Sequence, residues 1–355
     1  MPLRPWDSVS YLPLLALKPA EMRALEELPE QTKDRLLPLV PLRPWVGSHR
    51  LESSIDRIAV SYGDRPVLVE VGEREVPKSR PVFEELEALR SPDEGFDNWC
   101  EFIEQNENYI PVAQVGIDPI AERQQIARLH ALERGLAVRI ERSAFGGLGR
   151  LAVEIGRLTR GGLDVCFMID YGAVRSDHLL IAAQTVGLIR TVWAAAPLAT
   201  VSVSASSFPS SFTNLPRQLI FERRLFDEVA GQLGHERLIY GDRGSARADQ
   251  LGGGSGVIPA RIDYPDFEQW TFFRSDEAGL DGYIEQAQAL MASPLWNGEL
   301  RVWGTQMIER TARGDASAID TPSKSTAARI NLHLQLQTFH DDPGAVEDTE
   351  DDWED

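Results

Sequence analysis

The chain alternates short apolar segments with longer amphipathic stretches. Eight apolar segments have the length and residue types of β-strands, and each precedes a stretch with apolar residues at helical spacing. The predicted strands are 12–18, 36–43, 67–72, 110–116, 136–141, 165–170, 200–206 and 238–242. The predicted helices are 20–28, 51–62, 81–107 with a break at 91–92, 119–134, 148–159, 178–195, 215–230 and 280–292. This alternation predicts an α/β fold, a single (β/α)8 TIM-like barrel.

The segment beyond the eighth strand adds further elements. It contains a glycine-rich stretch at 252–256, a predicted hairpin of 260–264 and 270–274, and a predicted helix at 325–337 that we expect on the outside of the barrel. Residues 341–355 hold nine acidic side chains and no basic one, which is typical of a disordered tail. The predicted organisation is one barrel-like domain over 1–340 with C-terminal additions, and a disordered acidic tail over 341–355.

The chain is strongly acidic, with a formal net charge of −19 over 355 residues. A protein of that sign repels the phosphates of nucleic acids and of anionic membranes, so we expect neither as a partner. No uninterrupted apolar run reaches the roughly 18 residues of a membrane span, and two cysteines are too few for a disulfide framework. These features are typical of a cytoplasmic protein.

Polar residues often occupy the last positions of the predicted strands. Strand residues alternate between two faces, and the active sites of barrels lie at the C-terminal ends of the strands. The sequence therefore predicts a ring of polar side chains around one opening of the barrel. Its members are Lys18, Arg43, Glu70, Gln114, Arg139, Glu141, Asp170, Ser204, Ser206, Asp242 and Arg243.

Four members of this ring are candidate catalytic residues. Glu70, Asp170 and Asp242 could act as acid/base groups or hold a divalent cation, since carboxylates suit magnesium and manganese. Lys18 could form a Schiff base, with a salt bridge as the alternative. No histidine falls at a strand end, which argues against a zinc hydrolase of the His-rich type. A divalent cation is the cofactor that these residues suggest.

The remaining members are candidate ligand-binding residues. The planar guanidinium of arginine suits a phosphate or a carboxylate, so the arginines predict an anionic small molecule as the ligand. The predicted ligand-binding residues are Arg43, Gln114, Arg139, Glu141, Ser204, Ser206 and Arg243. The alternative is that the arginines only neutralise neighbouring carboxylates, for example Arg139 with Glu70 or Glu141 inside the barrel.

Several short segments resemble the beta protein family of phages and bacteria, a family named for a T4-type phage protein. The resemblance is carried by residues 11–21 (YLPLLALKPAE), Ala24-Leu25, 206–209 (SSFP), 240–242 (YGD) and 270–274 (WTFFR). The family pattern has a glycine before the glutamate, where this chain has Ala20 before Glu21. The resemblance implies a protein of phages and of bacterial mobile or defence neighbourhoods, and it brings no particular activity with it.

These observations support three functional hypotheses. The first is an enzyme or sensor that acts on an anionic small molecule or phosphoester at the opening of the barrel. The alternative is a non-catalytic factor in phage–host conflict or phage defence, in which the acidic tail engages a protein partner. The third is a glycosidase-like barrel with a pair of carboxyl groups spaced for acid/base chemistry.

Overall fold

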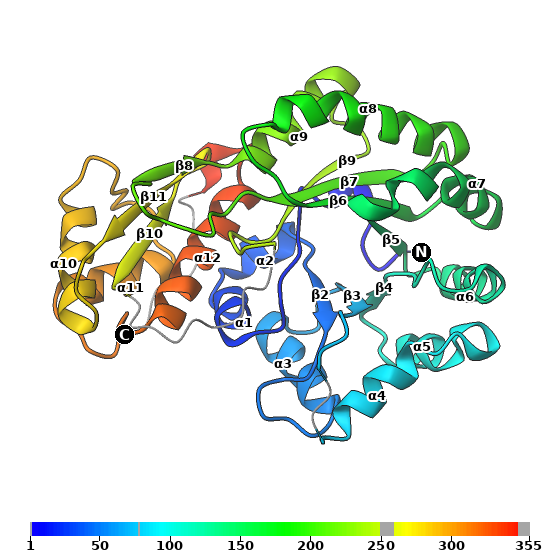
Figure 1. Cartoon of the computed structure of the whole chain (residues 1–355), viewed down its shortest axis with the longest axis horizontal. Helices are drawn as coiled ribbons and strands as arrows, with labels where there is room; N and C mark the ends of the chain where they lie inside the picture. Colours follow the sequence, from blue (N-terminus) through cyan, green and yellow to red (C-terminus); the bar gives the residue numbers. More distant parts are fainter. Residues whose placement is uncertain (1, 77–78, 249–258, 347–355) are drawn as a thin grey trace.

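The computed structural model describes residues 2–76, 79–248 and 259–346 (Figure 1). The strands are β1 (Tyr11–Pro13), β2 (Leu39–Leu42), β3 (Val67–Val71), β4 (Tyr109–Pro111), β5 (Leu136–Glu141), β6 (Val165–Ala173), β7 (Thr200–Ser206), β8 (Arg217–Leu219), β9 (Leu238–Asp242), β10 (Arg261–Pro265) and β11 (Gln269–Arg274). The α-helices are α1 (Pro19–Glu26), α2 (Glu30–Arg35), α3 (Glu52–Tyr62), α4 (Val82–Leu89), α5 (Asp93–Gln105), α6 (Pro119–Ala131), α7 (Leu148–Leu158), α8 (His178–Ala195), α9 (Phe221–Leu233), α10 (Leu280–Met291), α11 (Trp303–Ala312) and α12 (Pro322–Thr338). Short 3-10 helices cover η1 (Trp6–Ser8), η2 (Arg142–Gly147) and η3 (Pro343–Ala345).

The strands form two parallel sheets and one antiparallel sheet, and the predicted closed eight-stranded barrel is wrong. One parallel sheet has the order β1-β9-β7-β6-β5, and the other has the order β2-β3-β4. In the described residues these two sheets meet only through isolated bridges, such as Leu14 with Leu39 and Val112 with Ala137. The three-residue strands β1 and β4 end at Pro13 and Pro111, although the N–H that follows each proline still donates to the neighbouring parallel strand, Leu14 to Asp242 and Val112 to Val69 (both 2.8 Å).

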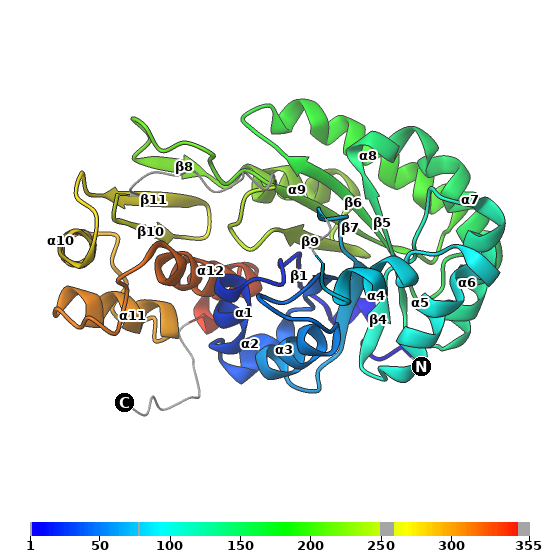
Figure 2. The same cartoon turned by 60° about the horizontal axis from the view of Figure 1, so that its bottom comes forward.

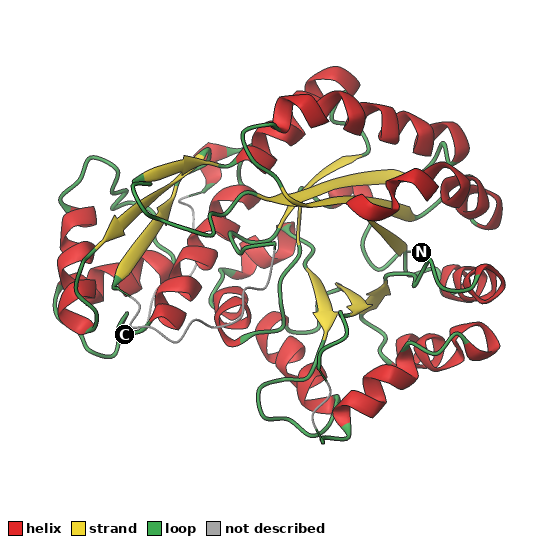
Figure 3. Ribbon diagram, viewed as in Figure 1, coloured by secondary structure: helices red, strands yellow, loops and turns green. Residues whose placement is uncertain are grey.

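The two parallel sheets still share one hydrophobic core. Inward-facing residues of both sheets, including Leu12, Leu68, Ile110, Met168 and Ile239, pack in a single buried cluster. A second and larger cluster lies between the strands and the helices α1 to α9, which cover the outer faces of the strands (Figure 3). The residues that follow β1, β2, β3, β5 and β9 consequently come together on the same side of the fold.

A C-terminal lobe, made of β8, β10, β11, α10, α11 and α12, lies beside the parallel sheets (Figure 2). It has its own core around Ile262, Tyr283 and Leu332. The helix predicted over 325–337 is present as α12, but its predicted location on the outside of a barrel is wrong. It is buried against α1, α11 and β10. Its polar side chains are buried with partners, as Asn331 shows by donating to the Ala24 carbonyl (3.0 Å) and accepting from the Gly304 N–H (2.9 Å).

Two further sequence expectations concern α8 and the chain terminus. By length and composition alone, α8 is the described helix that matches a membrane span, and in this structure it packs against α7 and α9. Residues 341–346 belong to the segment predicted as a disordered tail, and here Val346 is buried in the core of the C-terminal lobe. Residues 347–355 and the glycine-rich stretch 252–256 lie outside the described residues.

Candidate functional site

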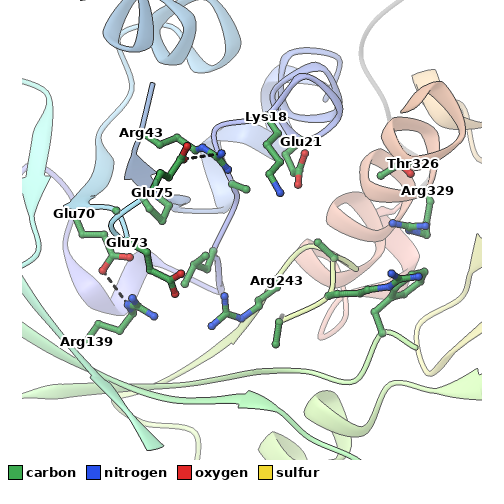
Figure 4. A pocket seen from close by; sticks show the side chains of 18 of the residues that line it. Lys18, Glu21, Arg43, Glu70, Glu73, Glu75, Arg139, Arg243, Thr326 and Arg329 are labelled. Carbon is green, nitrogen blue, oxygen red and sulfur yellow. Dashed lines mark hydrogen bonds and ion pairs between the residues drawn. The ribbon is translucent and has the colours of Figure 1, made fainter. Parts of the chain in front are cut away.

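A cavity of about 510 Å³ lies between the C-terminal ends of the parallel strands and the C-terminal lobe (Figure 4). Five predicted site residues line it, namely Lys18, Arg43, Glu70, Arg139 and Arg243. The lining also includes Glu21 and Arg74, together with Phe208, Arg247, Arg261 and Arg329 from the later part of the chain. In total it contains eight cationic side chains and four glutamates, an excess of positive charge in a chain whose net charge is −19.

Arg139 is fully engaged by carboxylates. Its Nε donates to Glu70 (2.9 Å), its Nη1 to Asp170 (2.8 Å), and its Nη2 lies 3.0 Å from Glu141. Although burial acts to lower the pKa of Arg139, the three carboxylates together raise it. Burial raises the pKa of Glu70. The geometry thus favours the alternative given by the sequence for this part of the ring, in which the arginine neutralises its neighbours.

The three carboxylates predicted as metal ligands do not converge. Glu70 and Asp170 are bound to arginines, and Asp242 lies apart from the cavity. Among the described residues, the only group of three His, Cys, Asp or Glu ligand atoms within 4.8 Å of one another consists of Asp227, Glu268 and His340. That group lies elsewhere in the fold and includes none of the predicted site residues.

Asp242 is the acceptor at the centre of a fully buried polar cluster. It accepts hydrogen bonds from the hydroxyls of Tyr11 and Tyr240, from Nε2 of His333 (2.6 Å) and from the N–H of Gly244 (2.7 Å). Burial acts to raise the pKa of Asp242, but the hydrogen bonds and the His333 ring hold it below its usual value. Asp242 therefore links β1, β9 and α12, and it does not open into the cavity.

The remaining predicted ligand-binding residues lie off the cavity. The hydroxyl of Ser206 donates to the Ala246 carbonyl (2.6 Å), and Ser204 is buried without a hydrogen-bond partner among the described residues. The amide of Gln114 donates to the Leu89 carbonyl (2.8 Å). Glu141 has a half-exposed side chain that faces Arg139. The proposed roles of these residues stay predictions.

Lys18 and Glu21 enter the cavity from the start of α1. Lys18 is the N-cap residue of this helix, and the next position is Pro19, which is favoured at the first helical position. Its ammonium has no ion pair with a described residue, whereas Arg43 on the neighbouring strand is paired with Glu75 (2.7 Å). Glu21 is buried, and burial raises its pKa. Figure 4 shows Lys18 and Glu21 side by side at the cavity wall.

The opposite wall carries three arginines, Arg247, Arg261 and Arg329, which we name the arginine cluster. Arg261 and Arg329 both bind the buried carboxylate of Asp263, at 3.0 Å from Nη2 of Arg261 and 2.6 Å from Nη1 of Arg329. Arg247 donates to the Pro209 carbonyl (3.1 Å) and has no carboxylate partner among the described residues. The cluster therefore has two guanidinium groups on one carboxylate and a third guanidinium without a carboxylate partner among the described residues.

Aromatic rings fix the orientation of this cluster. The guanidinium of Arg261 lies 3.5 Å from the centre of the Phe212 ring, and that of Arg329 lies 4.0 Å from the centre of the Phe208 ring. Both rings belong to a small hydrophobic cluster with Trp270 and Phe272. Stacking on aromatic faces holds a guanidinium flat while its N–H groups stay directed sideways. The arginine cluster is consequently pre-organised before any ligand enters.

The comparison with known proteins decides the family. The sequence model of the beta protein family matches residues 11–339. The chain belongs to the beta protein family. It is also 31% identical over 343 residues to Protein beta of Enterobacteria phage P4, with 94% of each chain covered. The resemblance in the sequence is thereby confirmed, with the relative coming from phage P4 and not from a T4-type phage. The matched region of this beta-family chain runs from β1 through α12 and includes the whole cavity lining.

Sequence reasoning missed two of the three arginines of this wall, Arg247 and Arg329. Arg261 is within reach of such reasoning as a cation near the opening, since it lies two positions before Asp263 on a predicted strand and so shares a face with it. Arg329 had no such signal, since α12 carries buried polar residues on all of its sides. Its place at the cavity follows from the packing of α12 against α1 and β10.

Proposed function

We propose that this beta-family protein binds an anionic small molecule, such as a phosphate ester, in the cavity next to the arginine cluster. One observation carries the proposal: Arg261 and Arg329 share the carboxylate of Asp263, and Arg247 has no ion-pair partner among the described residues. Isolated charges in a partly buried site are costly unless they are paired, so an incoming anion would supply the missing counter-charge.

The electrostatics of the cluster support this proposal. Burial, and then repulsion from Arg261, lower the pKa of Arg247. Burial also lowers the pKa of Arg329, with repulsion from Arg261 acting in the same direction. Guanidinium groups that repel one another are stabilised by a shared anion, and their N–H groups match the oxygens of a phosphate.

Glu21 is the cavity residue best suited to proton transfer on such a ligand. Its carboxyl is buried, its pKa is raised by that burial, and no described residue forms an ion pair with it. A raised pKa makes a carboxyl better suited to act as a general acid than one with an ordinary pKa. Glu70 and Asp170, the acids predicted from the sequence, are instead held by arginine. An enzymatic role of the cavity would therefore centre on Glu21.

Calorimetric titration with inorganic phosphate tests the proposal. We expect Arg247→Gln to weaken binding about tenfold or more, because a charge-assisted hydrogen bond contributes about 1.5–3 kcal/mol. The matched control is Arg157→Gln on α7, an exposed arginine paired with Glu154, which should bind like the wild type. Binding should also weaken as the salt concentration rises. Equal affinity of wild type and Arg247→Gln, or no binding by either, would contradict the proposal.

The alternative function, a protein-interaction factor in phage–host conflict or defence, stays a prediction. The acidic residues on which it rests lie mostly in 347–355, outside the described residues.

A further inference from the structure

We propose that the ligand of this cavity carries two separate anionic groups, one bound by the arginine cluster and the other by Lys18 and Arg243 on the facing wall. We name Lys18 and Arg243 the sheet wall, because they follow β1 and β9. This inference rests on the proposed function and specifies the ligand class: a small molecule with a phosphate-like group at each of two ends.

Lys18 is the first half of the argument. Its ammonium lines the cavity, and no described residue forms an ion pair or a side-chain hydrogen bond with it. Figure 4 shows its side chain directed into the cavity. The carboxyl of Glu21 lies beside it without an ion pair between the two; burial raises the pKa of Glu21, and the charge of Lys18 acts to lower it. An unpaired ammonium at a cavity wall is a ready partner for an anionic oxygen.

Arg243 is the second half. Its Nη2 donates to Asp170 (2.8 Å), a carboxylate that Arg139 also occupies, while its Nε is buried without a partner. The backbone beside it is fixed, since the N–H of Gly244 donates to the buried Asp242. Asp170 and Asp242 therefore act as positioning residues for Arg243, which has a donor left unsatisfied.

The two walls belong to different parts of the fold. Lys18 and Arg243 extend from the parallel sheets, whereas Arg261 and Arg329 extend from β10 and α12 of the C-terminal lobe. The lining also includes the uncharged side chains of Leu14, Ala16 and Phe208, which suit an uncharged spacer between two anionic ends. A ligand with one anionic group would satisfy only one of the walls.

The glutamates of the lining are compatible with this arrangement. Glu73 and Glu75 belong to an exposed loop at the rim, and Glu75 is paired with Arg43. Glu70 is bound to Arg139. Arg243 is likewise paired with Asp170, so the cationic side chains of the lining without an ion pair among the described residues are Lys18 on the sheet wall and Arg247 in the arginine cluster.

A series of alkane-α,ω-bisphosphonates with spacers of one to eight carbons tests the inference. Each bisphosphonate is compared by calorimetry with the alkyl monophosphonate of the same chain length. When one ligand engages two sites, the second contact becomes intramolecular, so at the spacer that spans both walls we expect binding about tenfold tighter or more. Shorter and longer spacers should bind less tightly than this optimum.

Two variants assign the two ends. Lys18→Gln should remove the advantage of the optimal bisphosphonate over the monophosphonate of the same length, whereas Arg247→Gln should weaken the binding of both ligands. Lys324→Gln, an exposed lysine paired with Asp320, is the matched control and should retain the advantage. Thermal unfolding checks that each variant is folded.

The outcomes separate this inference from the proposed function. If monophosphonates bind through Arg247 but no bisphosphonate binds more than twofold tighter, the two-wall inference is overturned and the proposed function stands. An advantage that survives Lys18→Gln also overturns it. If no phosphonate binds at all, both proposals fail.

Discussion

Asp242→Asn separates a structural role of Asp242 from the catalytic or metal-binding role that the sequence suggested. In the structure this carboxylate is fully buried and accepts four hydrogen bonds, from Tyr11, Tyr240, His333 and Gly244. An asparagine keeps the shape of the side chain but replaces one accepting oxygen by a donating NH2 group. Each carboxylate oxygen accepts two of these bonds, so the change leaves two donors without their acceptor.

The expected loss of stability is large. Hydrogen bonds to a charged group contribute about 1.5–3 kcal/mol each, and removing one partner of a buried charged pair typically costs about 3–5 kcal/mol. We therefore expect Asp242→Asn to lower the free energy of unfolding by about 3–5 kcal/mol at pH 7. Because the pKa of Asp242 is depressed in the folded state, its contribution is present above the unfolded pKa of about 3.9 and is lost below it. The difference between wild type and variant should consequently shrink as the pH falls through about 4.

Urea denaturation of both proteins between about pH 2.5 and pH 7, followed by circular dichroism, measures this difference on both sides of the unfolded pKa. Asp276→Asn, which changes an exposed aspartate, is the control and should stay within about 0.5 kcal/mol of the wild type. Added magnesium should not change the ranking of the three proteins. A loss below about 1 kcal/mol, or stabilisation by magnesium that disappears in Asp242→Asn, would refute the structural role.

Three further predictions follow from buried groups and from backbone geometry. Burial raises the pKa of Glu222 to about 8, so its ionisation costs free energy in the folded state only. In urea titrations the wild type should lose stability from pH 5 to pH 8 relative to Glu222→Gln, and parallel stability–pH profiles of the two proteins would contradict this. Burial raises the pKa of Cys100 to about 11 and that of Cys166 further, so a thiol reagent should label both only after unfolding; labelling of the native protein would oppose this. Gly244 has φ +56°, and a Cβ added there would lie 2.6 Å from a leucine methyl group. In urea denaturation Gly244→Ala should therefore lower the free energy of unfolding by about 1–3 kcal/mol, whereas Gly187→Ala, in open space on α8, should not lower it.

The local elements were largely predictable, because hydrophobic periodicity is strongest in long, regular segments. Strands 136–141, 200–206 and 238–242 and helix 178–195 have the predicted bounds. The pairing of strands was not predictable to the same degree. Segments 12–18 and 110–116 have apolar compositions that suit full strands, yet only three-residue strands form there. Whether neighbouring strands join into one sheet depends on how tertiary packing places them, and apolar composition does not report that placement.

Only the part of the candidate site that lies at the ends of the parallel strands was predictable from the sequence. Lys18, Glu70 and Arg243 line the same cavity, since the C-terminal ends of parallel strands point the same way. The arginine cluster lies on elements beyond the alternating strands and helices, and its position depends on how the C-terminal lobe packs. Arg329 is typical of this difficulty. A buried arginine on a helix without an apolar stripe can be placed only when its partner Asp263 and the ring of Phe208 are known.

The charges around the cavity show why a polar ring in the sequence does not by itself distinguish a site from a core. Arg139 has three carboxylates around it, so that part of the ring is electrostatically complete without a ligand. In the arginine cluster two guanidinium groups share Asp263 and the third, of Arg247, has no ion pair with a described residue, so further negative charge would complete it. Both groups are built from arginines and acidic residues. They differ in the number of carboxylates that the fold brings into contact with each arginine. The ratio of arginines to carboxylates within contact distance therefore identifies where a ligand would bind. The number of such residues along the chain does not.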